Sequence, residues 1–398
     1  MNYKISNKIT SLIITFIIFT IALPAHCDYP PDNAAVLYYR AFMLYQPDDT
    51  MADMLSKFAK GNIEINEKIK EFLNRRDIQR IIKTAMDASQ VTYCEWGMDL
   101  SDGWEIEMPN FASLRKLTFL ILANARFLAE QGDSKTALLQ CVAVKKMANH
   151  CGDVTFVPFT VCLAMNVYSN KVIRDILSNI DVSTLNWLKE ELKLIQTTKP
   201  KTEMAFNYEK EIVLIEFTGQ KLEEKLKNDM IKGLTNDPKE QQKLREISND
   251  PKLLERNLEY YKRHMNRMIE SCKLPYPKGY EQFKAIENNL RNDANSNPEA
   301  TLGTTLLSAF SSIYLMELRV KADENALTCA VDIFTENAKD KKLPDSLQPT
   351  SPNDPFSHKP FIYEKTPNEF ILKCDGKNLP EEAKEDIDKY EYKFKLEK

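Results

Sequence analysis

The stretch LTFLILANARFLAEQGDSKTALLQCVAVKKMANH, residues 117–150, decides the fold class. Two runs of apolar and small residues with helical spacing stand on either side of Gln131-Gly132-Asp133. The side chain of Asp133 or Ser134 can accept a hydrogen bond from the first turn of the second run. The stretch therefore predicts two helices joined by a tight turn.

The small residues of this stretch resemble one hairpin of the tetratricopeptide type, in which they allow close helix packing. The residues that carry the resemblance are Ala123, Ala129, Gly132, Asp133, Ala137 and Leu138. A solenoid needs at least about three repeats, and no second copy follows at a spacing of ~34 residues. An ordinary αα-hairpin in an irregular helical domain is the alternative.

Helical patterns fill most of the remaining chain, which has only 10 glycines in 398 residues. Further helices are expected at about 34–46, 63–74, 76–89, 155–180, 183–197, 202–233 and 302–338. The first of these, in PPDNAAVLYYRAFMLYQPDD, is mostly apolar, has Asn33 as its N-cap, and is expected to be buried. The sequence predicts a mainly α protein built as an array of antiparallel helix hairpins.

A further helix, within the segment 201–298 that is rich in Lys, Glu and Asn, carries a single apolar seam with steps of 4, 3, 4, 3 and 4 residues. That spacing places the seam on one face, which suits a coiled-coil arm or a partner-binding surface. An amphipathic helix packed on its own domain is the alternative. The candidate interaction seam consists of Leu254, Leu258, Tyr261, Met265 and Met268, and ends at Cys272.

The pattern changes after residue 342, where NDPFSHKPFIYEKTPNEFILKCDG (353–376) predicts two strands joined by a turn centred on Pro367-Asn368. Near the end, YEYKFKLE alternates apolar and charged residues, as a half-buried third strand does. We expect a small antiparallel sheet packed on the end of the last long helix. The domain plan is a helical domain over 28–340 and a β-hairpin module over 341–398.

This terminal module, over about 326–376, resembles the C-terminal part of the major pseudopilins of type II secretion. It also resembles a group of uncharacterised exported helical bacterial proteins that end in a DPFxxKPxxY module. The resemblance does not extend upstream, and the calcium-binding loop of pseudopilins has no match in KCDGKNLPEE, so no metal site is carried over. The module residues are expected to fix a tight turn and fill a small core: Asp354, Pro355, Phe356, Pro360 and Tyr363.

The N-terminus has the organisation of a secretory signal peptide over residues 1–27. Lys4 and Lys8 precede a 15-residue apolar run, ITSLIITFIIFTIAL (9–23), which Pro24 and Ala25 follow. An uncleaved anchor formed by residues 9–25 and a lipid-modified Cys27 are the alternatives. The protein is therefore expected to be exported to the periplasm or the extracellular space, with membrane contact only through such an anchor.

Charge and motifs exclude several classes of function. The net charge is −4, or about −6 without the first 27 residues, and acidic and basic residues are interspersed, so no nucleic-acid partner is expected. Phosphate-binding, dinucleotide-binding, zinc-protease, serine-hydrolase and C-x-x-C motifs are absent, and no cofactor or metal is expected.

The eight cysteines allow 105 disulfide pairings. His150, His264 and His358 are interpreted as surface or capping residues.

Two weak traces of a carbohydrate-active protein remain. Glu270-Ser271 at a helix end resembles the Glu-Ser pair of lytic transglycosylases, in which a glutamic acid protonates a glycosidic oxygen. Trp96 and Trp104 lie in a loop over 94–109, where together with the carboxylates from Glu95 to Glu107 they suit sugar binding or, as the favoured interpretation, a hydrophobic anchor. The leading hypothesis is a non-enzymatic protein that binds a protein partner in the envelope, and the alternative is a cell-wall glycosidase that uses Glu270.

Overall fold

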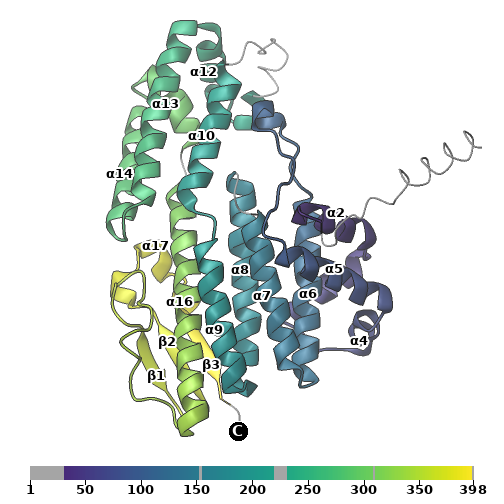
Figure 1. Cartoon of the computed structure of the whole chain (residues 1–398). Helices are drawn as coiled ribbons and strands as arrows, with labels where there is room; N and C mark the ends of the chain where they lie inside the picture. The colour runs from purple at the N-terminus through teal and green to yellow at the C-terminus, as the bar shows by residue number, and fades with distance from the viewer. Residues whose placement is uncertain (1–30, 152–154, 219–230, 308–309, 397–398) are drawn as a thin grey trace, which may run out of the picture.

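The computed structural model describes residues 31–151, 155–218, 231–307 and 310–396. Within these ranges the protein is mainly α-helical, with a three-stranded antiparallel sheet near the C-terminus (Figure 1), and the predicted fold class is confirmed. The longer helices are α2 (Ala34–Leu44), α3 (Asp49–Ala59), α4 (Glu67–Leu73), α5 (Arg76–Gln90), α6 (Phe111–Glu130), α7 (Ser134–Cys151), α8 (Phe156–Ile176), α9 (Val182–Thr197), α10 (Thr202–Thr218), α12 (Pro238–Asn249), α13 (Pro251–Cys272), α14 (Lys278–Asp293) and α16 (Phe310–Asp340). Shorter elements are α15 (Thr301–Leu306), α17 (Glu381–Lys384), β1 (Ile362–Lys365), β2 (Glu369–Lys373) and β3 (Glu391–Lys395).

The hairpin predicted from residues 117–150 is formed by α6 and α7. Gly132 takes a φ of 87°, a left-handed conformation that glycine adopts without strain, and so ends α6. The N–H of Asp133 donates to the carbonyl of Leu128 at 2.9 Å, while its carboxylate accepts from the N–H of Thr136 at 3.1 Å. Asp133 is therefore the N-cap of α7.

The α6–α7 hairpin is the centre of the helical array. Helix α8 packs against both of its helices, and α9 and α16 extend the array on the other side (Figure 1). Helices α2, α3 and α5 cover α6 and α7 at the opposite side, and α12–α14 lie together at one end of the molecule. The tetratricopeptide resemblance of the hairpin stays a prediction.

Helix α8 is the one helix among the described residues that is long and apolar enough to cross a membrane, judged by length and composition. Most of its residues are buried inside the protein, as in the core helix of a soluble domain. The predicted signal peptide or anchor, with Cys27, lies outside the described residues.

Charged side chains are buried where α7, α8 and α16 meet the end of α9. The Nζ atom of Lys145 lies 2.9 Å from Asn166 Oδ1, 2.8 Å from Asn170 Oδ1 and 3.4 Å from Glu324 Oε1. Lys199 Nζ lies 2.8 Å from the other oxygen of Glu324. Burial lowers the pKa of Lys145. Burial alone would raise the pKa of Glu324, but the two ammonium groups together outweigh it and hold that pKa below its ordinary value.

The terminal sheet has the strand order β1-β2-β3 and packs on α16. The turn between β1 and β2 is closed by a hydrogen bond from the Thr366 N–H to the Glu369 carbonyl at 2.8 Å, with Pro367-Asn368 at its centre as predicted. Phe370 stands opposite Phe394, and Phe334 of α16 lies 5.3 Å from Phe370 between ring centroids. The sheet and most helices share one continuous hydrophobic core. The domain boundary at residue 340 stays a prediction.

Three local expectations differ from the structure. His264 is buried with its ring stacked on Tyr260, and His150 is partly buried beneath α2, where Tyr38 bonds to its ring, so neither is an open surface residue. Helix α2 is buried on one side only. Its other side remains exposed because α5 and α6 pack against a single face of it.

Candidate functional site

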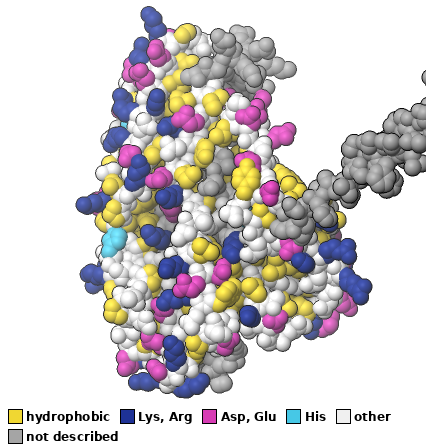
Figure 2. Space-filling view, viewed as in Figure 1, with side chains coloured by type: hydrophobic (Ala, Val, Ile, Leu, Met, Phe, Trp, Pro, Cys, Tyr) yellow, Lys and Arg dark blue, Asp and Glu magenta, His cyan; other side chains and the backbone are white. Residues whose placement is uncertain are grey.

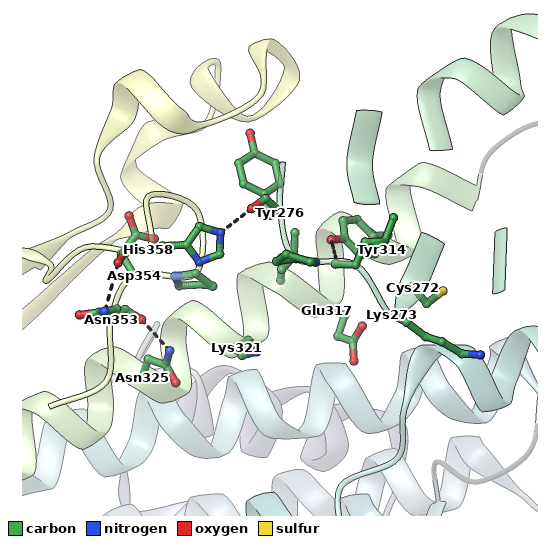
Figure 3. Close-up of a pocket in the computed structure, with 14 residues that line it drawn as sticks. Cys272, Lys273, Tyr276, Tyr314, Glu317, Lys321, Asn325, Asn353, Asp354 and His358 are labelled. Atoms are coloured by element: carbon green, nitrogen blue, oxygen red, sulfur yellow. Dashed lines mark hydrogen bonds between the residues drawn. The ribbon is translucent and has the colours of Figure 1, made fainter. Parts of the chain in front are cut away.

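A cleft of about 510 Å³ lies where α13, α16 and the terminal module meet (Figure 3). Three chain segments line it: residues 272–276 after α13, one face of α16, and the turn over 353–358. Tyr314, Leu318, Lys321 and Asn325 follow one another at steps of four, three and four residues, and Glu317 precedes Leu318, so helical geometry places the α16 residues on one face. They are Tyr314, Glu317, Leu318, Lys321 and Asn325.

The wall that follows α13 is fixed by two tyrosine hydroxyls. Tyr314 donates to the carbonyl of Leu274 at 3.1 Å, and Tyr276 donates to the carbonyl of Asn378 at 2.6 Å. A Cβ added at Gly279 would lie 2.6 Å from the Tyr314 hydroxyl, which explains why glycine stands there. The segment between α13 and α14 is thus held to both α16 and the terminal module.

Asp354 organises the opposite wall, and its side chain is completely buried. Its carboxylate accepts hydrogen bonds from the Phe356 N–H at 2.9 Å, the Ser357 hydroxyl at 2.7 Å and the Asp375 N–H at 3.2 Å. Asn325 of α16 donates to the carbonyl of Asn353 at 2.7 Å. The turn is therefore rigid and tied to α16.

His358 joins the two walls. Its Nε2 atom is hydrogen-bonded to the carbonyl oxygen of Tyr276, and a carbonyl can only accept, so the proton is on Nε2. The residue takes a φ of 57°, and its N–H donates to the Asp354 carbonyl at 2.8 Å. His358 is therefore a bridging residue at the rim of the cleft.

The ionisable groups in the cleft are mostly engaged in holding it together. Burial raises the pKa of Tyr276 to about 12 and also raises the pKa of Tyr314 and of the Cys272 thiol, so all three stay protonated at neutral pH. Glu317 accepts a hydrogen bond from the Thr202 hydroxyl. Lys321 is exposed and forms no ion pair with any residue in the described ranges. Among the charged side chains that line the cleft, Glu317 and Asp354 accept hydrogen bonds and Lys273 pairs with Glu270, whereas the ammonium group of Lys321 has no counter-ion among the described residues.

The candidate interaction seam on α13 faces the interior. Tyr261, Met265 and Met268 are buried, and Leu254 and Leu258 are partly buried against the same core, where α13 packs on α10 and α14. These residues therefore form the amphipathic packing face of the helix. A partner has no access to them while α13 is packed in this way.

Glu270 lies on the solvent side of α13, next to the cleft but not among the residues that line it. Its side chain is 68% exposed and pairs with Lys273, 2.7 Å apart between Oε1 and Nζ. This position gives the carboxyl group no enclosing groove of the kind that holds a glycosidase acid in its protonated form.

The module residues divide between core and surface. Asp354, Pro355 and Phe356 are buried, and the Phe356 ring packs against Tyr276 and Tyr390. Pro360 is exposed, and Tyr363 is half-buried with its ring against Phe370.

Trp96 is a buried anchor, as favoured from the sequence. Its ring stacks on Tyr38 and its Nε1–H donates to the His150 carbonyl at 2.7 Å. Trp104 is partly exposed and packs against Phe217.

The sequence did not indicate Lys321, Asn325 or Tyr314 as site residues. Their spacing on one helix face was a visible signal, but the segments that complete the cleft are far away in the chain.

Among the described residues no group of three or more His, Cys, Asp or Glu side chains is arranged to hold a metal ion. No family model matches the chain, and neither a curated protein nor a solved structure matches it.

Proposed function

We propose that the protein is an exported, non-enzymatic component of the periplasm or cell envelope that binds a protein partner in the cleft between α13, α16 and the terminal module. The observation that carries this proposal is the unpaired ammonium group of Lys321 on a rigid wall. A charge without an internal counter-ion is free to pair with an acidic group of a ligand. The partner segment is therefore expected to carry a carboxylate.

The state of the other cleft groups supports binding rather than catalysis. Tyr276 and Tyr314 use their hydroxyls in structural hydrogen bonds, and the Cys272 thiol is kept protonated by burial. A nucleophile or general base needs a pKa closer to the working pH and a neighbouring base or acid. The rest of the visible face is an even mixture of acidic and basic side chains (Figure 2), which suits contact with proteins better than with a polyanion.

The test compares charge-reversal variants of the tagged, exported protein after mild crosslinking in its native envelope. Lys321→Glu is expected to lose a stoichiometric protein partner that the unsubstituted protein captures. Lys57→Glu makes the same change of charge on α3, outside the cleft, and is expected to retain the partner.

Equal capture by both variants would show that the partner binds elsewhere. Recovery of cell-wall fragments without a protein partner would favour the glycosidase alternative, and Glu270→Gln should then abolish cleavage of peptidoglycan.

A further inference from the structure

We propose that the outward face of α2 rests on the surface of a phospholipid bilayer. This α2 face consists of Val36, Tyr39, Met43 and Leu44, together with Tyr93 beside the start of the helix. All five are exposed, and Met43 is 80% exposed. Large apolar side chains grouped in this way mark a contact surface.

The opposite side of α2 holds the helix rigidly to the protein. Leu37, Tyr38 and Phe42 are buried, and the rings of Tyr38 and Phe42 both stack on Trp96. The Ala34 N–H donates to the Tyr93 carbonyl at 2.9 Å, which fixes Tyr93 next to the helix. The exposed face is therefore a property of the packed fold.

Arg40 distinguishes a lipid surface from the other occupants of this face. Helical spacing of 100° per residue places Arg40 between Val36 and Leu44, within the exposed apolar stripe. A wholly apolar occupant, such as the run of residues 9–23, would leave the guanidinium group buried without a counter-ion. A symmetric contact between two copies would bring two Arg40 side chains together.

A bilayer satisfies both requirements of this face. Its acyl and glycerol region accepts the apolar side chains, and tyrosine is favoured at the interface. The long stem of Arg40 can lie along the apolar surface while its guanidinium group reaches a lipid phosphate. The segment over 34–47 contains no acidic side chain that a negatively charged surface would repel.

The short stretch of chain between the apolar run of residues 9–23 and α2 also favours contact with a bilayer. The apolar run ends at Leu23, and ten residues separate it from Ala34. Ten residues span at most about 35 Å when fully extended. A run inserted in the bilayer would therefore keep α2 close to the membrane surface, with its apolar face available for contact.

The test uses the full chain in vesicles of phosphatidylethanolamine and phosphatidylglycerol. The photoreactive residue p-benzoylphenylalanine replaces Met43 or, as the matched control, Leu194, an apolar residue of α9 that is 56% exposed. Illumination is expected to form phospholipid adducts from position 43 and not from position 194.

A second measurement substitutes Arg40 and again determines the yield of the lipid adduct from p-benzoylphenylalanine at position 43. Arg40→Glu is expected to reduce the lipid adduct about fivefold, whereas Arg40→Lys should largely keep it. Adducts to residues 1–30 of the same chain, adducts to a second copy, or equal lipid labelling at positions 43 and 194 would each overturn the proposal.

Discussion

The ammonium group of Lys145 and the carboxylate of Glu324 meet inside the helical bundle, 3.4 Å apart between Nζ and Oε1. The two residues are 179 positions apart in the chain and join α7 to α16. Lys199 completes the contact from the end of α9. Because all three are shielded from water, α16 can pack here only in a register that brings these opposite charges together.

Removing the central carboxylate should destabilise the fold strongly. Glu324→Gln leaves Lys145 and Lys199 without their shared counter-ion, and we expect the free energy of unfolding to fall by about 3–5 kcal/mol. Urea denaturation measures this change. Asp53→Asn breaks the exposed pair between Asp53 and Lys57 and should cost less than about 1 kcal/mol. Similar losses in both variants would show that the buried cluster has no special role.

Acid should destabilise the protein through His150. Burial lowers its pKa from 6.5 to about 4, and its ring is hydrogen-bonded to the Tyr38 hydroxyl. Between these values the unfolded chain binds a proton that the folded chain does not, so stability present above pH 6.5 is lost as the pH falls toward 4. The loss from this group should be at most about 3 kcal/mol.

The measurement for His150 is the unfolding free energy of the wild type and His150→Gln across this range. The variant cannot titrate at this position, so its stability should fall less steeply between pH 6.5 and pH 4. Parallel curves would show that His150 does not contribute to the pH dependence.

Gly279→Ala should disturb the wall of the cleft. The added methyl group would lie 2.6 Å from the Tyr314 hydroxyl and 2.8 Å from the Ser271 carbonyl, and we expect a loss of about 1–3 kcal/mol in thermal or urea unfolding. Gly233, in the helical residues 231–234, provides the control Gly233→Ala, because its new Cβ would meet no side chain or neighbouring element within 4 Å and helix propensity predicts no loss. An unchanged midpoint for Gly279→Ala would mean that the wall moves freely.

Asp354→Ala should loosen the turn that carries the terminal module. The substitution leaves the N–H groups of Phe356 and Asp375 without acceptors, and we expect the unfolding free energy to fall by about 2–4 kcal/mol. Limited proteolysis should then cut within 341–360 sooner than in the wild type. Asp345→Ala removes an exposed carboxylate from the same region and should not change the cleavage rate.

The reactivity of the cysteine thiols tests how closely the protein packs around them. The seven cysteines of the described ranges are present as thiols, five of them are buried, and only Cys94 and Cys272 are partly accessible. Burial raises the pKa of Cys94 to about 12, so even this thiol should react slowly with iodoacetamide at pH 8. Mass spectrometry should find seven modified cysteines over 31–396 after unfolding without reductant. A smaller number would indicate that some of these cysteines form a disulfide.

The sequence alone determined the helices, their order and the small terminal sheet. The α6–α7 turn was predictable because Gly132 and Asp133 act within one turn of chain, and the strands because alternation in YEYKFKLE is equally local. The seam on α13 was visible as an apolar pattern, but the pattern does not say whether the seam faces a partner or the core. Because α10 and α14 pack against α13, the seam is buried in the core.

Only the tertiary structure decided where the charges and the cleft lie. Lys145, Asp323 and Glu324 resemble solvated helix positions in sequence, yet they are buried because four elements converge on them. Lys321 and His358 line the same cleft because α16 and the terminal module fold against the α13–α14 connection. Hydrophobic periodicity specifies which face of an element is buried, but the pairing of faces depends on contacts between residues hundreds of positions apart, which no local pattern encodes.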